Sequence, residues 1–343
     1  MAEEGKVVLA HGGGGKLSHD LVRDRIVGAF ENFEPFEKKG LARLDDSALI
    51  EAGASRLAFT TDSYVVKPLF FSGGDIGKLA VCGTINDLAV MGAEPLYLSC
   101  GLIVEEGLPF DTLDRIVASM GETARTAGVR IVTGDTKVVE RGSADQFFIN
   151  TSGIGLMRKG VDVSPERIRV GDRILVSGTL GDHGMAVLSA REGLHFEGDL
   201  RSDCAALNGL IARMMEVSSG IRFMRDPTRG GLASTLNEIV EGRDFGLVIE
   251  ENALPIRDSV RGLCELLGFD PLYVANEGKV VAVVAPEDAE ALTEAMRNHP
   301  LGREACVIGT VEETWKGRVG MKTAVGGTRV VDMLVGDQLP RIC

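Results

Sequence analysis

Short apolar runs alternate with longer amphipathic stretches through residues 44–157. Apolar residues that recur every three or four positions predict two helices, at 75–91 and 111–127. Asp111 is suited to cap the start of the second helix, and Gly128 ends it. Strands are predicted at 57–61, 129–133 and 147–156. This alternation of strands and helices is typical of an α/β domain.

A second block with the same alternation starts near Arg167. Its strands are predicted at 173–177, 246–250 and 279–284. Its helices are predicted near 184–192 and 203–216, after Thr228, and from Pro286, a residue that suits a first helical turn. The chain is therefore expected to form two α/β (α+β) domains, joined near residues 158–168.

The two ends of the chain differ from these blocks. The last nine residues contain Gly336 and Pro340, which disfavour regular structure. At roughly 3.3 Å per residue, this tail could extend about 30 Å and carry Cys343 away from the fold. We assign 1–40 to a glycine-rich leader and first helix, 41–157 to an N-terminal domain, 168–334 to a C-terminal domain and 335–343 to a mobile tail.

Composition narrows the range of partners and the cellular location. The 343 residues include 50 acidic and 37 basic side chains, a net charge of −13, which disfavours nucleic acid and anionic membranes as partners. No apolar run is long enough for a membrane span, and the start lacks a signal-peptide pattern. Five of the six cysteines lie in apolar stretches typical of reduced core thiols, which favours a cytoplasmic location. The sixth, Cys343, is the last residue, and a core role does not explain it.

Several aspartates form a candidate metal site. Asp62 and Asp135 follow predicted strands, at the edge where α/β sheets usually bind ligands. The others are Asp45, Asp46, Asp87 and Asp226. Carboxylates that converge repel one another unless cations lie between them, and oxygen-only ligands favour Mg²⁺ bridging to nucleotide phosphates. A single aspartate of this kind is more often a turn or cap residue, so the hypothesis depends on the set.

A glycine run near the start is a second candidate for phosphate binding. It consists of Gly12, Gly13, Gly14 and Gly15, followed by Lys16. Backbone N–H groups and a lysine can close over phosphates. The spacing is neither a Walker motif nor GxGxxG, and a flexible leader is an equally good interpretation.

Lys137 and Glu277 are candidates for proton transfer. Lys137 follows Asp135 in GDTKV, and Glu277 lies in VANEGKV between a predicted helix and a predicted strand. The ordinary interpretations are a surface lysine and a loop carboxylate. The alternative is a proton-transfer pair contributed by the two domains.

Motifs along essentially the whole chain carry a family resemblance. Those at 45–48 (DDSA), 60–63 (TTDS), 83–95 (GTINDLAVMGAEP) and 226–231 (DPTRGG) are similar to the superfamily of aminoimidazole ribonucleotide synthetase, selenophosphate synthetase and thiamine-phosphate kinase. Within it, the chain resembles the HypE family of hydrogenase maturation factors through HGGGGK, VTGDTKVV at 132–139, NEGK at 276–279 and the terminal PRIC. PRIC with cysteine as the last residue is the most specific mark.

The resemblance implies a two-domain aminoimidazole ribonucleotide synthetase-like fold. The N-terminal domains, which bind ATP, would pair in a homodimer whose sheets combine into a barrel. The residues implied to hold Mg²⁺ and phosphates are Asp45, Asp46, Asp62, Asp87 and Asp226. Those implied to line or cover the nucleotide are Thr133, Gly134, Asp135 and Thr136, together with the leader residues Gly12–Gly15 and Lys16.

The resemblance also implies a reaction, the ATP-dependent dehydration of an S-carbamoyl group on Cys343 to a thiocyanate. This chemistry supplies the cyanide ligands of nickel–iron hydrogenase. Cys343 would act as nucleophile and tether, with Glu277 as the base and Lys137 as its electrostatic partner, or with these two roles exchanged. HypF would deliver the carbamoyl group, and the HypC–HypD complex would accept the cyanide.

Two rival functions stay open on the sequence. A selenophosphate synthetase-like or thiamine-phosphate kinase-like enzyme would act on a free small molecule, but neither explains PRIC, and the leader lacks a reactive cysteine. A non-catalytic carrier would only ferry a group on its tail. Such a carrier has no use for the aspartate set.

Overall fold

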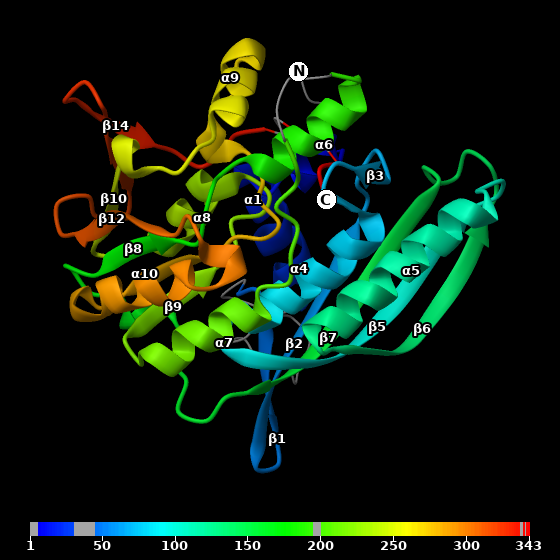
Figure 1. Cartoon of the computed structure of the whole chain (residues 1–343), viewed down its shortest axis with the longest axis horizontal. Coiled ribbons are helices and arrows are strands. Elements are labelled where there is room, and N and C mark those ends of the chain that lie inside the picture. The colour runs from blue at the N-terminus through cyan, green and yellow to red at the C-terminus, as the bar shows by residue number, and fades with distance from the viewer. Residues whose placement is uncertain (1–5, 31–44, 195–199, 337–338, 340) are drawn as a thin grey trace.

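The computed structural model describes residues 6–30, 45–194, 200–336, 339 and 341–343. The predicted boundary between residues 40 and 41, and Pro340 of the tail, lie outside these ranges. The described residues form two mixed α/β units, which confirms the predicted fold class (Figure 1). Among them, no helix has both the length and the apolar character needed to cross a bilayer.

The N-terminal unit is a five-stranded sheet in the order β1-β2-β7-β5-β6, in which only the β5–β6 pair is parallel. Helices α4 and α5 cover one face of this sheet (Figure 1). Side chains from both helices and from β5 and β7 form one apolar core. The bounds are β1 Ala48–Ala52, β2 Ser55–Tyr64, β3 Phe70–Phe71, β4 Gly74–Asp75, α4 Ile76–Val90, β5 Ala93–Glu105, α5 Phe110–Ala127, β6 Arg130–Val139 and β7 Phe147–Met157.

Within the described ranges, the other face of the N-terminal sheet is largely exposed. Strands β1 and β6 are exposed along almost their whole length. Large apolar side chains exposed on this sheet are Leu49, Ile50, Phe59, Ile103, Ile131, Val132, Val138, Ile154 and Leu156. An exposed apolar face of this extent is typical of an interaction surface.

The C-terminal unit is a seven-stranded sheet in the order β14-β13-β10-β12-β8-β11-β9. Helix α8 packs on one face, and α7 and α10 pack on the other. The bounds are β8 Arg173–Val176, α6 Asp182–Glu192, α7 Asn208–Val217, β9 Ile221–Arg225, α8 Gly231–Val240, β10 Gly246–Glu250, α9 Asp258–Leu267, β11 Val281–Val284, α10 Ala289–Arg297, β12 Cys306–Glu312, β13 Val319–Lys322 and β14 Thr328–Val331.

Three predicted helix starts were wrong. Pro109, not Asp111, caps α5, and it makes no side-chain cap bond. Helix α7 begins at Asn208 rather than at 203, because Asn86 of α4 binds the segment before it: the Leu207 N–H donates to Asn86 Oδ1 at 2.8 Å. The helix predicted after Thr228 begins only at Gly231, because the φ of Gly230 is +77° and breaks the helical path.

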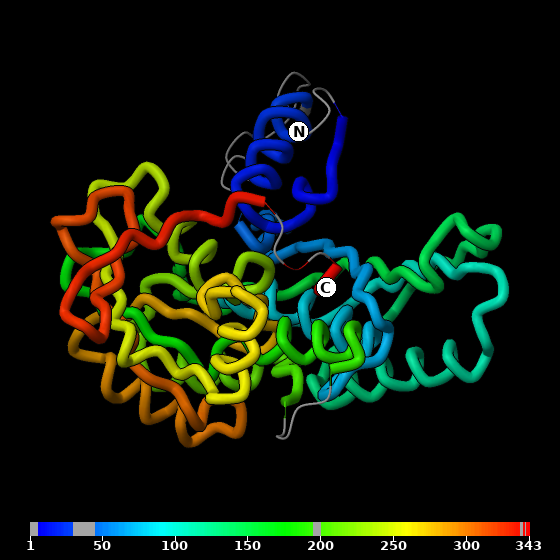
Figure 2. Tube along the Cα trace, turned by 90° about the horizontal axis from the view of Figure 1, so that it is seen from above, coloured from blue at the N-terminus to red at the C-terminus, as the bar shows by residue number. Residues whose placement is uncertain are grey.

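The leader projects from the body, and the C-terminal segment crosses at its base (Figure 2). The leader contains η1 Leu9–Gly12, α1 Lys16–Asp20, η2 Leu21–Val27 and α2 Gly28–Phe30. The Lys16 N–H donates a 2.9 Å hydrogen bond to the carbonyl of Leu334. The leader therefore packs against the segment that precedes the C-terminal tail.

Candidate active site

Three carboxylates from three separate segments converge at the centre of the molecule. Asp46 precedes β1, Asp87 lies on α4, and Asp226 follows β9; one carboxylate oxygen of each lies within 4.8 Å of the others. Thr60 Oγ1 lies 2.8 Å from Asp87 Oδ2 and 2.8 Å from the Asp46 carbonyl. Arg225 Nε lies 3.2 Å from the Asp46 carboxylate and offsets part of its charge. The fold thus assembles a cluster of oxygen donors.

The carboxylates of this cluster disfavour one another's ionisation. Burial raises the pKa of Asp226 to about 8, with repulsion from Asp46 adding to it. Burial raises the pKa of Asp46 to about 6 against the opposing charge of Arg225, and it raises the pKa of Asp87 well above its usual range. Ionising all three groups together is costly without a cation between them. An oxygen-only set of this kind fits Mg²⁺.

Two of the five aspartates predicted to hold metal lie outside this close group. Asp62 is half-buried on β2, where the Ser63 N–H donates to its carboxylate at 3.0 Å. Its charge still contributes to the raised pKa values of Asp46, Asp87 and Asp226. Asp45 is half-buried beside Asp46. The structure therefore brings together Asp46, Asp87 and Asp226 and leaves the other two at the periphery.

Glu277 lies in the loop before β11, with only 2% of its surface exposed. Its Oε1 finds no hydrogen-bond partner among the described residues. Burial raises the pKa of Glu277 well above the usual range, and the charges of Asp226, Asp62 and Asp203 raise it further. A buried carboxyl of this kind is a stronger base, once ionised, than a carboxylate in water.

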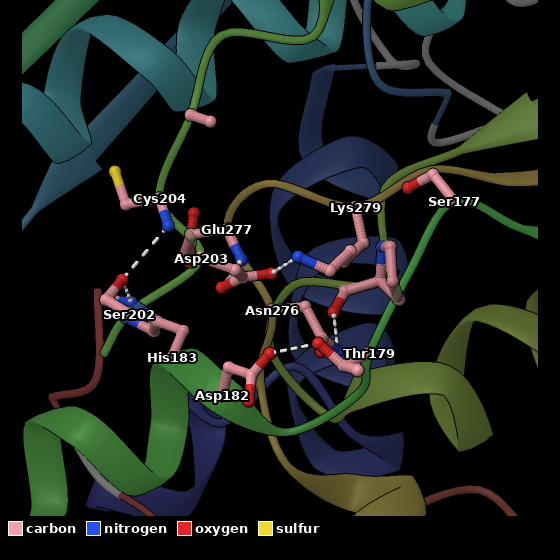
Figure 3. A network of polar contacts seen from close by, with 12 residues as sticks. Ser177, Thr179, Asp182, His183, Ser202, Asp203, Cys204, Asn276, Glu277 and Lys279 are labelled. Carbon is pink, nitrogen blue, oxygen red and sulfur yellow. Dashed lines mark hydrogen bonds and ion pairs between the residues drawn. The ribbon is translucent and has the colours of Figure 1, made fainter. Parts of the chain in front are cut away.

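A buried ion pair fixes the backbone at Glu277. The Glu277 N–H donates to Asp203 Oδ1 at 3.1 Å, and Lys279 Nζ lies 3.1 Å from Asp203 Oδ2 (Figure 3). From the N-terminal domain, Asn86 Nδ2 donates to the Glu277 carbonyl at 3.4 Å. The loop is therefore held from both domains.

The GDTK segment lies away from this cluster within one chain. Thr133, Gly134, Asp135, Thr136 and Lys137 are all exposed on β6, the edge strand of the sheet. Lys137 Nζ pairs with Asp135 Oδ2 at 2.7 Å, and no ion pair joins it to Glu277 within the described ranges. The predicted partnership of Lys137 and Glu277 stays a prediction.

The glycine run packs against the C-terminal domain. Gly14 has a φ of +70°, and a Cβ added to it would lie 2.6 Å from Arg229 Cβ. A Cβ on Gly15 would clash with the Leu334 carbonyl. Gly12 and Gly13 line a small cavity beside Arg229, whereas Lys16 is exposed. Close packing, as well as any ligand, therefore explains glycine at Gly14 and Gly15.

The end of the chain is docked in this region. A terminal carboxylate oxygen of Cys343 accepts the Val65 N–H at 3.1 Å, and the Arg341 carbonyl accepts the Lys67 N–H at 3.2 Å. Cys343 is 8% exposed and belongs to the apolar core of the N-terminal unit. The expectation that this thiol has no place in a core is therefore corrected. The mobility of the tail stays a prediction.

Several residues of the site were missed in the sequence. Arg229 and Lys279 lie inside the motifs DPTRGG and NEGK, and membership of these motifs could have indicated them as site residues. The negative charge of Cys343 is the largest influence that raises the pKa of Arg229. Asp203 had no local pattern, because its role arises only from contacts between distant segments.

The comparisons with known proteins agree with this architecture. The family model described as AIR synthase related protein, N-terminal domain, matches residues 44–157, and that of the C-terminal domain matches 169–322. The chain is thus an AIR synthase related protein. Carbamoyl dehydratase HypE of Rhodobacter capsulatus is 55% identical over 338 residues, which cover 98% of each chain. The chain belongs to the HypE family of carbamoyl dehydratases.

Two solved structures support the same assignment. One is a HypE–HypF complex, with a TM-score of 0.84 and 48% identity, covering 90% of this chain and 99% of the other. The other is HypE in complex with ATP, with a TM-score of 0.81 and 49% identity, covering 98% of this chain and 100% of the other. The predicted family resemblance is confirmed over nearly the full length.

Proposed function

We propose that the chain dehydrates a carbamoyl group on its own Cys343 to a thiocyanate, at the expense of ATP. As a HypE-family member it is a carbamoyl dehydratase of hydrogenase maturation. The observation that carries the proposal is the docking of Cys343 against Val65, directly after the segment that bears Asp62 and Tyr64. This contact places the Cys343 main chain beside the strand that bears Asp62, and the charges of Cys343, Asp62 and Glu277 all raise the pKa of Arg229.

The reaction explains why a nucleotide is needed. Converting S–C(=O)–NH₂ into S–C≡N removes one oxygen and two protons, and oxide is a poor leaving group. Transfer of the ATP γ-phosphoryl group to the carboxamide oxygen makes phosphate the leaving group. The ATP complex of a HypE that is 49% identical supports ATP as the phosphoryl donor. Products are thiocyanate, ADP and phosphate; of the two protons on nitrogen, one ends on the phosphate and the other passes through the base to solvent.

Mg²⁺ is the second part of this proposal. Asp46, Asp87 and Asp226 would hold it, with Asp62 and Asp45 close by. When bound, it neutralises the charge that develops on the transferred phosphoryl group. The three carboxylates then ionise without mutual repulsion, which their raised pKa values otherwise oppose.

Glu277 is our candidate for the base. Its buried oxygen without a partner among the described residues and its pKa, raised by burial, suit a general base. Because the substrate is tethered through Cys343, the dehydration is intramolecular, and the entropic cost of bringing the reactants together is lowered. The exchanged assignment, with Lys137 as base, is less well supported because Lys137 is exposed and paired with Asp135.

In a homodimer, Lys137 and the other residues of GDTK could contribute to the nucleotide site. We infer that the uncovered apolar face of the N-terminal sheet pairs with the same face of a second copy, closing the sheets into a barrel. Such pairing buries β6 and brings Thr133–Lys137 of one subunit toward the nucleotide site of the assembly.

The remaining partners follow from the chemistry. A carbamoyl donor must reach Cys343, and the HypE–HypF complex of a relative supports HypF in this role. The cyanide acceptor is inferred to be HypC–HypD. Because Cys343 is buried when docked, exchange with either partner requires the tail to leave this position. All six cysteines are free thiols, which fits our inference of a cytoplasmic location.

The test is mass spectrometry of the C-terminal peptide after incubation with HypF, carbamoyl phosphate and ATP. The expected sequence is a carbamoyl adduct on Cys343, followed by loss of water. Cys343→Ser is expected to abolish both adducts and to leave ATP affinity unchanged, whereas Cys100→Ser is the control and forms both. Absence of the dehydrated adduct from the wild-type peptide contradicts the proposal.

A further inference from the structure

His183 has no role in the chemistry above, yet both of its ring nitrogens are engaged at the end of the chain. It lies in the first turn of α6 and is fully buried. Its Nδ1 lies 2.8 Å from Ser202 Oγ, and its Nε2 lies 2.8 Å from the carbonyl oxygen of Ile342. Its ring also meets the edge of Phe71, with centroids 5.4 Å apart. A buried imidazole thus contacts the residue before Cys343.

The hydrogen bonds fix the tautomer of this ring. The Ile342 carbonyl can only accept, so Nε2 carries the hydrogen and donates it. Burial lowers the pKa of His183, which favours the neutral ring, so Nδ1 accepts. Ser202 Oγ then donates to Nδ1 while accepting the Cys204 N–H at 3.1 Å. Each member of this chain of hydrogen bonds has one consistent direction.

The contacts of the last three residues show how the His183–Ile342 hydrogen bond contributes to holding the end of the chain. The Arg341 carbonyl and the terminal carboxylate of Cys343 accept N–H groups from Lys67 and Val65 of the N-terminal domain. The carbonyl between them, on Ile342, is bound by His183 of the C-terminal domain. His183, together with Arg191 of α6, which donates to the Arg341 carbonyl at 2.7 Å, therefore holds the end of the chain to the C-terminal domain. Because the bond goes to the main chain, it fixes the position of Cys343 regardless of the side chain at 342.

We propose that His183, held in its Nε2–H form by Ser202, is a positioning residue that keeps the terminal Cys343 docked for dehydration. The proposal rests on the proposed function, in which the Cys343 thiol carries the substrate. His183 does not touch the reacting atoms. It acts through the Ile342 main chain.

The experiment compares His183→Ala, His183→Gln and Ser202→Ala in the full-length protein. One readout is the rate at which a maleimide labels Cys343, followed on the C-terminal peptide. The other is the single-turnover rate of dehydration after carbamoylation. Loss of one buried hydrogen bond changes the equilibrium constant for local opening by roughly five- to tenfold. His183→Ala is therefore expected to speed labelling and to slow dehydration by about that factor, with ATP affinity unchanged.

Glutamine places an amide N–H near the position of Nε2, so His183→Gln is expected to restore both rates most of the way. Ser202→Ala leaves the ring but removes its partner, and a smaller change in the same direction is expected. If His183→Ala does not fold, the proposal is tested by whether Ser202→Ala changes the labelling and dehydration rates more than His183→Gln does. Unchanged labelling of Cys343 in the folded variants overturns the proposal, as does slow dehydration without faster labelling. Maleimide labelling does not depend on the dehydration reaction. Wild-type protein whose Cys343 is labelled slowly but is never dehydrated would therefore contradict the proposed function and leave the positioning role of His183 intact.

Discussion

The main-chain N–H of Val65 donates a 3.1 Å hydrogen bond to a terminal carboxylate oxygen of Cys343. Residues 278 positions apart thereby become neighbours, and the end of the chain joins the strand segment that follows Asp62. Arg191 adds to this docking from α6, donating to the carbonyls of Lys67 at 2.9 Å and Arg341 at 2.7 Å. Cys343, the proposed carrier of the substrate, and the candidate catalytic residues thus belong to one folded unit.

Replacement of Glu277 tests its assignment as the base. Glu277→Gln keeps the shape but cannot accept the proton, so the carbamoyl adduct on Cys343 is expected to accumulate without dehydration. In the wild type, the base form appears only as pH rises through the raised pKa of Glu277, so the dehydration rate is expected to increase with pH across a range above that of an ordinary glutamate. Single-turnover mass spectrometry at several pH values measures both effects. Normal dehydration by Glu277→Gln rules out the role.

The stability of the metal-free protein is expected to fall as pH rises from about 5 to 8.5. Asp46 and Asp226, with pKa values of about 6 and about 8, hold protons in the folded state that an ordinary aspartate of pKa about 4 has released in the unfolded state. The folded state binds more protons in this window, so the free energy of unfolding decreases with pH. Thermal melts across this range measure the slope.

Mg²⁺ is expected to reverse this loss, raising Tm more at pH 8.5 than at pH 5.5, because protons compete with the cation at the lower pH. Asp226→Asn is the matched control. It removes one repelling charge, so it is expected to stabilise the metal-free protein at pH 8.5 and to reduce the response to Mg²⁺. Equal Mg²⁺ shifts in Asp226→Asn and the wild type contradict the metal site.

The buried Asp203–Lys279 pair is expected to show strong coupling. Lys279→Met leaves the Asp203 carboxylate buried without its partner, at a cost of about 3–5 kcal/mol in the free energy of unfolding. Adding Asp203→Asn removes the second charge and is expected to recover much of that loss. Urea titration measures each variant. Glu216→Gln, which breaks the exposed pair with Arg213, is the control and is expected to cost less than about 1 kcal/mol.

Mixed dimers test whether Lys137 acts across a subunit interface. Lys137→Ala and Glu277→Gln are each expected to be impaired alone. If a site combines Lys137 of one subunit with Glu277 of the other, mixing the two variants regenerates one intact site in each mixed dimer. Dehydration is then expected to return toward half of the wild-type rate in those dimers. A mixture that stays as inactive as its components shows that both residues act from the same chain.

Much of the secondary structure could be predicted from the sequence, since α5 follows the helical spacing of apolar residues and Gly128 ends it with a φ of +74°. The family could also be read, because whole motifs and the terminal PRIC stand in linear order. Helix starts were less predictable. The start of α7 depends on Asn86, which lies more than a hundred residues away in the chain.

By itself, the sequence determined the fold class, the family and the candidate set of carboxylates, because these depend on local periodicity and on contiguous motifs. Only the tertiary structure decided that Asp46, Asp87 and Asp226 meet while Lys137 remains at a sheet edge. It also decided that Cys343 is buried and that His183 holds its neighbour. The physical reason is that hydrogen bonds and desolvation act between atoms in space, and no spacing along the chain records which distant segments the packing of two domains brings into contact.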